Sequence, residues 1–401
     1  MNKTIALIGA LDSKGDEFAF VKEAIEKRGH HVLMINVGII GKPAFTPDIS
    51  AQQVAAAGGV SLQTLRDQAD RGSAIDVMTK GVAAIAKTLF DQGKFAGLLG
   101  MGGSAGTVIA TAAMRELPVG FPKVMVSTLA AEDTTAYVGT KDIVLIPSVV
   151  DVAGVNRISA RVFANAVGSI VGMVESAVPE IEERPLIAAS MFGNTTQLVD
   201  QCRAILQERG YETLVFHATG TGGRSMESLI NDGYFDGVLD LTTTELADEL
   251  VGGVLSAGPE RLDAAAGNGV PQVIAPGCLD MANFWAPETI PDKYRDRLFY
   301  KWNPNVTLMR TSPEENGKLG KILAEKANRS TGPVAFYLPL QGVSILDSPG
   351  GEFWWPEANQ SLFSAIKENL RDDIPVYELD NNINDEDFSK AVTEQLLTYL
   401  S

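Results

Sequence analysis

Cysteine and histidine are scarce in this sequence, which limits the chemistry open to it. The 401 residues include two cysteines, Cys202 and Cys278, and three histidines. Two cysteines cannot form the disulfide framework of a small secreted domain, and the dispersed histidines lack the clustering that zinc needs. The sequence also opens without the apolar leader of a secreted protein. We therefore expect a cytoplasmic protein with no metal centre of this kind. Because no histidine lies near Cys278 in sequence, we expect an unreactive thiol there.

Basic residues are scarce relative to acidic ones. Lysine and arginine number 33 against 50 aspartates and glutamates, which gives a net charge of −17. Such a surface repels nucleic acids and anionic membranes, and no run of basic residues counteracts it. The uncharged stretch Phe95–Met114 is long enough to span a bilayer, but the glycine cluster within it predicts a strand, a turn and a helix instead. We expect neither nucleic acid nor membrane as a partner.

The chain repeats itself weakly. Residues 4–39 align with residues 185–220 without gaps, and Phe95–Leu99 matches Phe235–Leu239. Both halves alternate short apolar segments with amphipathic ones, the pattern of a parallel sheet covered by helices on both faces. The predicted fold class is therefore α/β, with two Rossmann-like parallel-sheet domains arranged as a tandem pseudo-repeat.

The halves differ in where they are extended. We assign residues 1–178 to an N-terminal nucleotide-binding domain and residues 183–401 to a C-terminal domain. The charged segment Pro179–Pro185, framed by prolines, is the predicted hinge. The first half has a long insertion after its second strand, which we expect to form loops and helices near the strand ends. The second half adds strands near Val334–Leu338 and Val376–Leu379.

A helix is predicted over residues 153–177, with small residues at every fourth position. Such residues fall on one face and permit close approach of another element. Two interpretations stay open: this face forms a dimer or interdomain contact, or it packs on the domain's own sheet. The small residues are Ala160, Ala164, Gly168 and Gly172.

The most informative motif is a glycine-rich turn between a buried strand and a helix. Such a turn presents bare N–H groups and the positive end of a helix to an anion. A Walker A loop would need a lysine where Thr107 follows Gly106, and an NAD site would need an acidic residue after the next strand, Lys123–Val126. The alternative is that the glycines only allow close packing. The predicted phosphate-binding residues are Gly102, Gly103, Ser104, Ala105, Gly106 and Thr107.

Polar residues also follow the neighbouring predicted strands. Lys14 is predicted to neutralise the bound phosphate, while Asp12 or Ser13 can instead cap the next helix. Asp133 is a candidate ligand of Mg²⁺ through water, and the threonines nearby are candidate donors to phosphate or ribose. For each of these residues a plain turn or cap is the alternative role. The full set after these strands is Asp12, Ser13, Lys14, Thr128, Asp133, Thr134, Asp151 and Asn156.

A second glycine loop follows a strand in the C-terminal half. It too ends a strand and opens a helix, so it can hold an anion, and an arginine there offers a fork for carboxylate or phosphate. We predict that it binds a small anionic substrate facing the nucleotide across the domain cleft. The predicted substrate-binding residues are Gly220, Gly222, Gly223 and Arg224.

Five motifs together resemble a conserved uncharacterised family that includes the N-terminal domain of the tomato tobamovirus-resistance protein. The resemblance spans most of the chain, and it implies two Rossmann-like subdomains, ATP binding in the N-terminal one, and dimerisation. No settled reaction comes with the family. The motifs are Gly9–Gly15, Gly100–Thr107, Tyr137–Asp142, Val149–Asn156 and His217–Arg224.

Two classes of function remain open. The first is a cytoplasmic ATP-binding protein, with Mg²⁺ as a candidate companion, that acts as an ATP-dependent enzyme on a small anionic metabolite. The second is a non-catalytic, nucleotide-dependent homodimer that serves as a sensor or interaction module, because no clear general base, nucleophile or metal cluster is visible. The missing ribose acid disfavours a third class, the NAD-dependent oxidoreductases.

Overall fold

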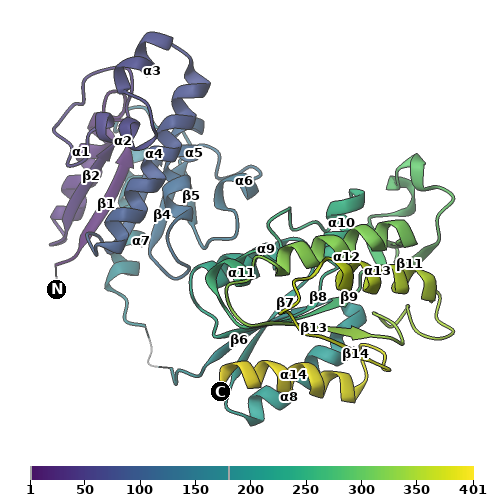
Figure 1. The fold of residues 1–401 in the computed structure, drawn as a ribbon. Coiled ribbons are helices and arrows are strands. Elements are labelled where there is room, and N and C mark those ends of the chain that lie inside the picture. Colours follow the sequence, from purple (N-terminus) through teal and green to yellow (C-terminus); the bar gives the residue numbers. More distant parts are fainter. Residues whose placement is uncertain (1, 179–180) are drawn as a thin grey trace. The chain divides into compact units, whose positions relative to one another are not determined.

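The computed structural model describes residues 2–178 and 181–401. The chain forms two compact units, Met1–Glu180 and Ile181–Ser401, each built on its own parallel sheet (Figure 1). The α/β class and the two Rossmann-like domains predicted from the sequence are confirmed. Pro179 and Glu180 of the predicted hinge lie outside the described residues. None of the described helices is both long and apolar enough to cross a membrane.

The first unit contains a five-stranded sheet in the order β2-β1-β3-β4-β5, and all its neighbouring strands run parallel. Successive residues of β1 face opposite sides, so Ile5 and Leu7 enter one apolar cluster while Ala6 and Ile8 enter another. The strands are β1 (Thr4–Gly9), β2 (His31–Asn36), β3 (Gly97–Gly102), β4 (Lys123–Ser127) and β5 (Val144–Pro147).

Helices cover both faces of this sheet. Helices α1 and α7 pack on the face of Ile5 and Leu7, and α2, α3, α4 and α5 pack on the opposite face (Figure 1). The predicted insertion after β2 supplies α2, α3 and α4. The helices are α1 (Gly15–Glu26), α2 (Ala51–Ala57), α3 (Leu62–Gln68), α4 (Arg71–Asp91), α5 (Ser104–Arg115), α6 (Thr135–Val138) and α7 (Ser159–Glu175).

The second unit repeats this plan with one additional strand. Its six parallel strands lie in the order β14-β13-β9-β8-β6-β7, so the first five in chain order take the same relative places as β1 to β5. This shared order confirms the tandem pseudo-repeat. The strands are β6 (Leu186–Met191), β7 (Glu212–His217), β8 (Gly237–Thr242), β9 (Gln272–Gly277), β13 (Val334–Pro339) and β14 (Val376–Leu379).

Helices α8 and α14 cover one face of the second sheet, and α9 to α13 cover the other (Figure 1). Between β9 and α12 the chain forms an antiparallel sheet, β10-β12-β11, which the sequence analysis did not predict. These elements are η1 (Gly193–Thr195), α8 (Thr196–Glu208), α9 (Thr221–Asn231), α10 (Thr244–Val251), α11 (Ala264–Asn268), β10 (Met281–Phe284), η2 (Pro287–Thr289), η3 (Asp292–Tyr294), β11 (Phe299–Asn303), β12 (Val306–Arg310), α12 (Pro313–Ala327), α13 (Pro356–Asn369) and α14 (Glu386–Leu400).

Helix α7 packs on its own sheet, but not through its small residues. Phe163, Val167 and Ile170 are buried against the strands, whereas Ala164 and Gly172 are exposed. The interpretation that the small face packs on the sheet is therefore wrong. Dimerisation through that face stays a prediction.

Two helical glycines of the first unit give a test of its packing. A Cβ at Gly81 of α4 would lie 1.9 Å from the Val54 carbonyl oxygen of α2, whereas a Cβ at Gly172 of α7 would meet nothing within 4 Å. We expect Gly81→Ala to destabilise the unit by about 1–3 kcal/mol through overpacking. Gly172→Ala is the matched control and should stabilise it by about 0.5–1 kcal/mol. Urea unfolding followed by circular dichroism measures both, and equal effects would contradict the close α2–α4 contact.

Candidate functional site

The strands of the first sheet all end at one edge, and this brings the predicted site loops together. Gly100 pairs in register with Ile8, and Ser127 pairs with both Gly102 and Pro147. The strand order reverses between β1 and β3, so this edge has a topological switch point between the loops that follow those two strands. Open α/β sheets bind ligands at such a point. Lys14 and the glycine turn flank it, as the sequence predicted.

Helix α5 begins inside the glycine turn, at Ser104. Its N-cap is Gly103, and no side chain caps it. The first intrahelical hydrogen bond runs from the Thr107 N–H to the Gly103 carbonyl, at 2.8 Å. The N–H groups of Ser104, Ala105 and Gly106 therefore have no acceptor within the helix. Together with the helix dipole they form an anion-binding end.

The glycines of the turn serve different purposes. A Cβ at Gly100 would lie 2.6 Å from that of Ala110, and one at Gly102 would lie 2.9 Å from the Cα of Gly106, so both positions need glycine for packing. At Gly103 the nearest atom would be the Thr128 hydroxyl oxygen, 3.8 Å away. Packing therefore explains part of the glycine cluster but leaves open space beside Gly103.

Thr107 has a packing role in the structure. Its side chain is buried, and its hydroxyl lies 2.9 Å from the Gly103 carbonyl oxygen and 2.7 Å from the Ser127 hydroxyl. These contacts tie α5 to β4. The hydroxyl is thus occupied inside the protein, and the expectation that it contacts phosphate is corrected.

Asp12 and Ser13 do not cap α1. The N-cap is Lys14, without a side-chain hydrogen bond. Asp12 accepts hydrogen bonds from the N–H groups of Ile40 and Gly41 at 2.8 and 3.0 Å, so it fastens the loop after β2 over the end of β1. This corrects the capping role suggested for the two residues, of which Ser13 is exposed.

Lys14 lies at the strand edge and links two loops. Its ammonium donates a hydrogen bond to the Val152 carbonyl in the loop after β5. An ammonium has three N–H donors, so two of them are without an acceptor among the described residues and can serve a ligand. Glu17 reinforces the link, because its buried carboxylate accepts from the Gly154 N–H. Sequence reasoning missed Glu17, which reads as an ordinary residue in the first turn of a helix.

The residues after β4 and β5 divide into accessible and internally bonded ones. Thr128 and Thr134 are half-buried and Asp151 is exposed. Asn156 accepts from the N–H groups of Ile158 and Ser159 at the start of α7, which is the turn role given as the alternative.

Asp133 also takes part in a turn. It accepts a hydrogen bond from the Thr135 N–H at 3.0 Å, and its contacts with Thr135 lower the pKa of this exposed carboxyl. Among the described residues no group of three or more histidines, cysteines, aspartates or glutamates is arranged to hold a metal.

The second glycine loop already holds an anion, which is one of the protein's own side chains. The buried Glu245 carboxylate accepts from the N–H groups of Gly220 and Gly223 at 2.7 and 3.1 Å. Gly222 is needed for packing, because a Cβ there would lie 1.9 Å from the His217 carbonyl oxygen. The prediction of a free substrate site at this loop is therefore corrected. Arg224 is exposed and donates to the Ser256 carbonyl.

Glu245 belongs to a buried charge cluster centred on Arg261. Arg261 donates to both carboxylate oxygens of Asp240 at 2.5 and 2.6 Å, to Glu245 at 2.7 Å and to Glu227 at 3.1 Å. Burial alone would lower the pKa of Arg261, but these carboxylates raise it well above its usual value. Burial raises the pKa of Glu227. The cluster joins α9, β8 and α10. Through Glu245 it also holds the glycine loop in place.

A second buried cluster lies after β9. Asp280 accepts from the Ser344 hydroxyl at 2.8 Å, and Asp347 lies 3.3 Å from the Arg310 guanidinium. The other oxygen of Asp280 is buried without a partner among the described residues. Burial also raises the pKa of the Cys278 thiol well above its usual value, which is the behaviour expected of an unreactive cysteine.

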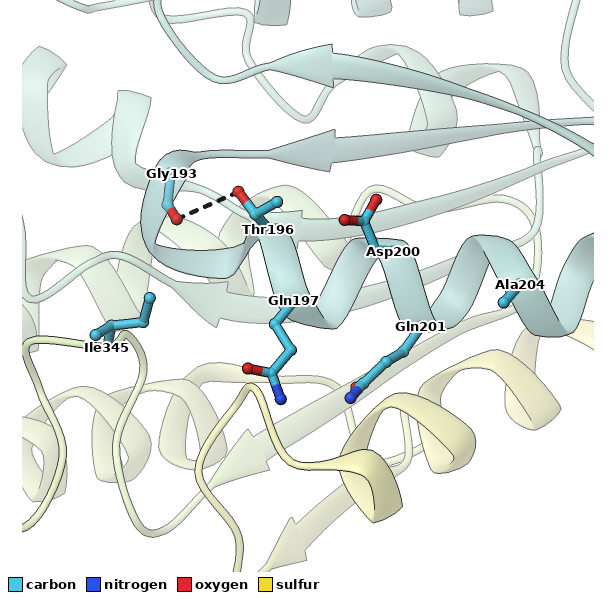
Figure 2. A pocket seen from close by; sticks show the side chains of 7 residues that line it. All are labelled: Gly193, Thr196, Gln197, Asp200, Gln201, Ala204 and Ile345. Atoms are coloured by element: carbon cyan, nitrogen blue, oxygen red, sulfur yellow. Dashed lines mark hydrogen bonds between the residues drawn. The ribbon is translucent and has the colours of Figure 1, made fainter.

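The second unit also has an open groove along α8, which sequence reasoning did not find. Its volume is about 630 Å³. Figure 2 shows Gln197 and Gln201 on one side of the helix, while Thr196 bonds back to the Gly193 carbonyl at 3.2 Å. None of the predicted site residues lines it. The lining residues are Gly193, Thr196, Gln197, Asp200, Gln201, Ala204 and Ile345.

These features define a two-unit α/β protein with a candidate anion site at the switch point of its first sheet. The chain belongs to an uncharacterised protein family, UPF0261. The family's N-terminal domain matches residues 3–179 and its C-terminal domain matches residues 184–400.

The relatives include both bacterial and plant proteins. A UPF0261 protein of Clostridium tetani is 50% identical over 100% of both chains. Another, from Mesorhizobium japonicum, is 44% identical over 97% of this chain and 98% of its own length. The ToMV resistance protein Tm-1(GCR237) of Solanum lycopersicum is 37% identical over 97% of this chain and 55% of its own length. The family suggested by the sequence motifs is confirmed.

The Asp280 cluster predicts a pH dependence of stability in the second unit. Burial and the neighbouring Asp347 raise the pKa of Asp280 to about 7. The folded chain therefore holds this proton more tightly than the unfolded chain, whose aspartates titrate near pH ~3.9. The resulting stabilisation is fully present below the pKa that Asp280 has in the unfolded chain. It is lost as the pH rises through the pKa that Asp280 has in the folded chain.

Asp280→Asn carries a neutral amide at every pH. Between pH 5 and 8 its free energy of unfolding should therefore fall less than that of the parent, by on the order of 2 kcal/mol. All four tryptophans lie in this unit, so tryptophan fluorescence during urea unfolding reports on it. The exposed Asp200→Asn serves as control and should keep the parent's profile. Parallel profiles for all three proteins would contradict the raised pKa.

Proposed function

We propose that the first unit binds ATP, with the phosphates at the start of α5, and that the protein acts on a small anionic metabolite. The observation that carries the proposal is the uncapped end of α5 at the switch point, beside open space at Gly103. Lys14 supplies a positive charge at the same edge. The family's resemblance motifs favour ATP among the phosphate-bearing ligands. We further propose a cytoplasmic homodimer.

The two units differ at equivalent places, and the difference supports this choice of site. At the switch point of the second sheet, the loop after β6 is joined to the end of β8 by the hydroxyls of Thr195 and Thr242, which lie 2.8 Å apart and are fully buried. In the first unit Ser104 is exposed and Lys14 and Thr128 are half-buried. The first edge thus leaves accessible donors for a ligand, whereas these two hydroxyls of the second edge are buried and bonded to each other.

Each candidate residue has a defined chemical task in this proposal. The N–H groups of Ser104, Ala105 and Gly106 would bind phosphate oxygens, with Lys14 adding a charge-assisted hydrogen bond. Thr128, next to Gly103, would donate to a phosphate or to the ribose. Mg²⁺ prefers oxygen ligands and retains waters, so the exposed carboxylates of Asp133 and Asp151 fit an outer-sphere role.

A second candidate function is a non-catalytic nucleotide sensor. The hydrogen bonds of the carboxylates at the strand edge of the first sheet favour this function. Asp12, Glu17 and Asp133 all accept hydrogen bonds from backbone N–H groups, so they hold loops in place rather than standing free as general bases. Asp151 is the exposed carboxylate left among the predicted residues.

Gly103→Leu tests the binding site at a position where an added Cβ has no contact closer than 3.8 Å. The leucine would occupy the space beside the α5 end, so we expect ATP affinity to fall at least tenfold while the thermal midpoint is kept. Isothermal titration with ATP, with and without Mg²⁺ and with NAD as comparison, measures this. Gly267→Leu on α11 of the second unit is the matched control, because an added Cβ there meets nothing within 4 Å, and it should bind like the parent. Unchanged affinity in Gly103→Leu would remove the proposed site.

Lys14→Ala separates the enzyme from the sensor. If the protein is an enzyme, the pure parent protein should release phosphate from ATP steadily. Lys14→Ala should lose this activity, because the variant no longer neutralises the charge of the phosphates. A parent that binds ATP but releases no phosphate, with or without candidate metabolites, would favour the sensor.

A further inference from the structure

Val149 has a backbone conformation that its side chain disfavours. Its φ is +66°, in the left-handed region. A β-branched residue is an outlier there, because its Cβ crowds the following carbonyl. The other described non-glycine residues with positive φ differ in setting. Leu262 and Cys278 are buried in the core of the second unit, and Ala69 ends α3.

The side chain of Val149 gains little from the folded chain. It is 77% exposed, so burial does not compensate for the strained backbone. Glycine or asparagine would take this conformation with less strain. Strained positions that persist without a packing reason cluster at ligand sites, where the side chain meets something outside the chain.

Val149 stands at the same strand edge as the proposed phosphate site. It follows β5 by two residues, and the preceding Ser148 N–H donates to the Ser127 carbonyl at 3.0 Å. The Thr128 N–H donates in turn to the Gly102 carbonyl at 3.3 Å. The three strand ends are thus tied side by side, and β5 lies two strand spacings, about 10 Å, from β3. A nucleotide is long enough to cover that separation.

On the β2 side of the α5 end, the edge of the sheet is covered by the loop after β2. The loop after β2 lies on Asp12, and a Cβ at Gly38 would come within 2.5 Å of the Asp12 carboxylate. Arg66 holds the same loop through the carbonyl oxygens of Ile39 and Gly41. A ligand whose phosphates lie at α5 therefore has room toward β4 and β5 rather than toward β2.

We propose that Val149 packs against the apolar face of the adenine base and so helps determine affinity for the nucleoside part of the ligand. This inference rests on the proposed ATP binding. The half-buried Thr128, between the α5 end and Val149, then lies where the ribose hydroxyls pass. The strained valine is kept because its methyl groups are covered by the base when the ligand is bound.

Val149→Gly tests the inference through two opposite effects. Removing the strain should raise the thermal midpoint by about 2–4 °C, while losing the methyl groups should weaken ATP binding about tenfold. Inorganic tripolyphosphate lacks the base, so its affinity should be unchanged. Ile40→Ala is the matched control, since Ile40 is 92% exposed on the β2 side, and it should bind ATP like the parent.

The outcomes distinguish this inference from the proposed function. If the parent binds neither ATP nor tripolyphosphate, the proposed site fails and the inference fails with it. If the parent binds both and Val149→Gly binds ATP equally well, the base contact alone is overturned. An equal loss of ATP and tripolyphosphate affinity would also overturn it, because the substitution would then act through the loop and not through the base.

Discussion

Parallel strand pairing is the constraint on which the rest of this structure depends. Parallel strands need crossover helices, and their carboxyl ends all meet at one edge of the sheet. In the first unit this rule brings together five loops that are far apart in sequence, from Ala10 to Asp151. The candidate site follows from the pairing, because no single loop holds all its residues. The second unit obeys the same rule with the same strand order.

The two units nevertheless use the shared edge differently, and buried charge is the reason. Arg261 needs several carboxylates, since an unpaired buried guanidinium would be very costly. Asp240, Glu227 and Glu245 meet that need, and Glu245 then also occupies the glycine loop that a ligand would otherwise enter. The corresponding edge of the first unit has no such cluster among its described residues, and the end of α5 stays accessible. The same topology thus gives a strand edge whose glycine loop is occupied by a carboxylate in the second unit and an accessible strand edge in the first.

The sequence predicted the architecture well because hydrophobic periodicity and strand-turn-helix signals are local. The repeat of Phe95–Leu99 in Phe235–Leu239 corresponds to β3 and β8, which hold equivalent places in the two sheets. The antiparallel sheet between β9 and α12 was missed, since its strands are short and depend on one another for pairing. The roles of Asp12 and Thr107 were also misjudged, because each is bonded to a group that only the fold brings near. Asn156 takes the turn role that had been left open, with N–H groups two and three residues further along the chain.

Sequence patterns alone established the fold class, the pseudo-repeat, the glycine turns and the family, because each of these patterns is carried by short stretches of consecutive residues. Tertiary structure decided which of those turns is available. Glu245 is far from Gly220 in sequence, and Val149 is farther still from Gly103, yet the first pair is in contact and the second lies along one edge. Burial, register and charge pairing between distant segments set these relations, and a linear pattern carries no record of them.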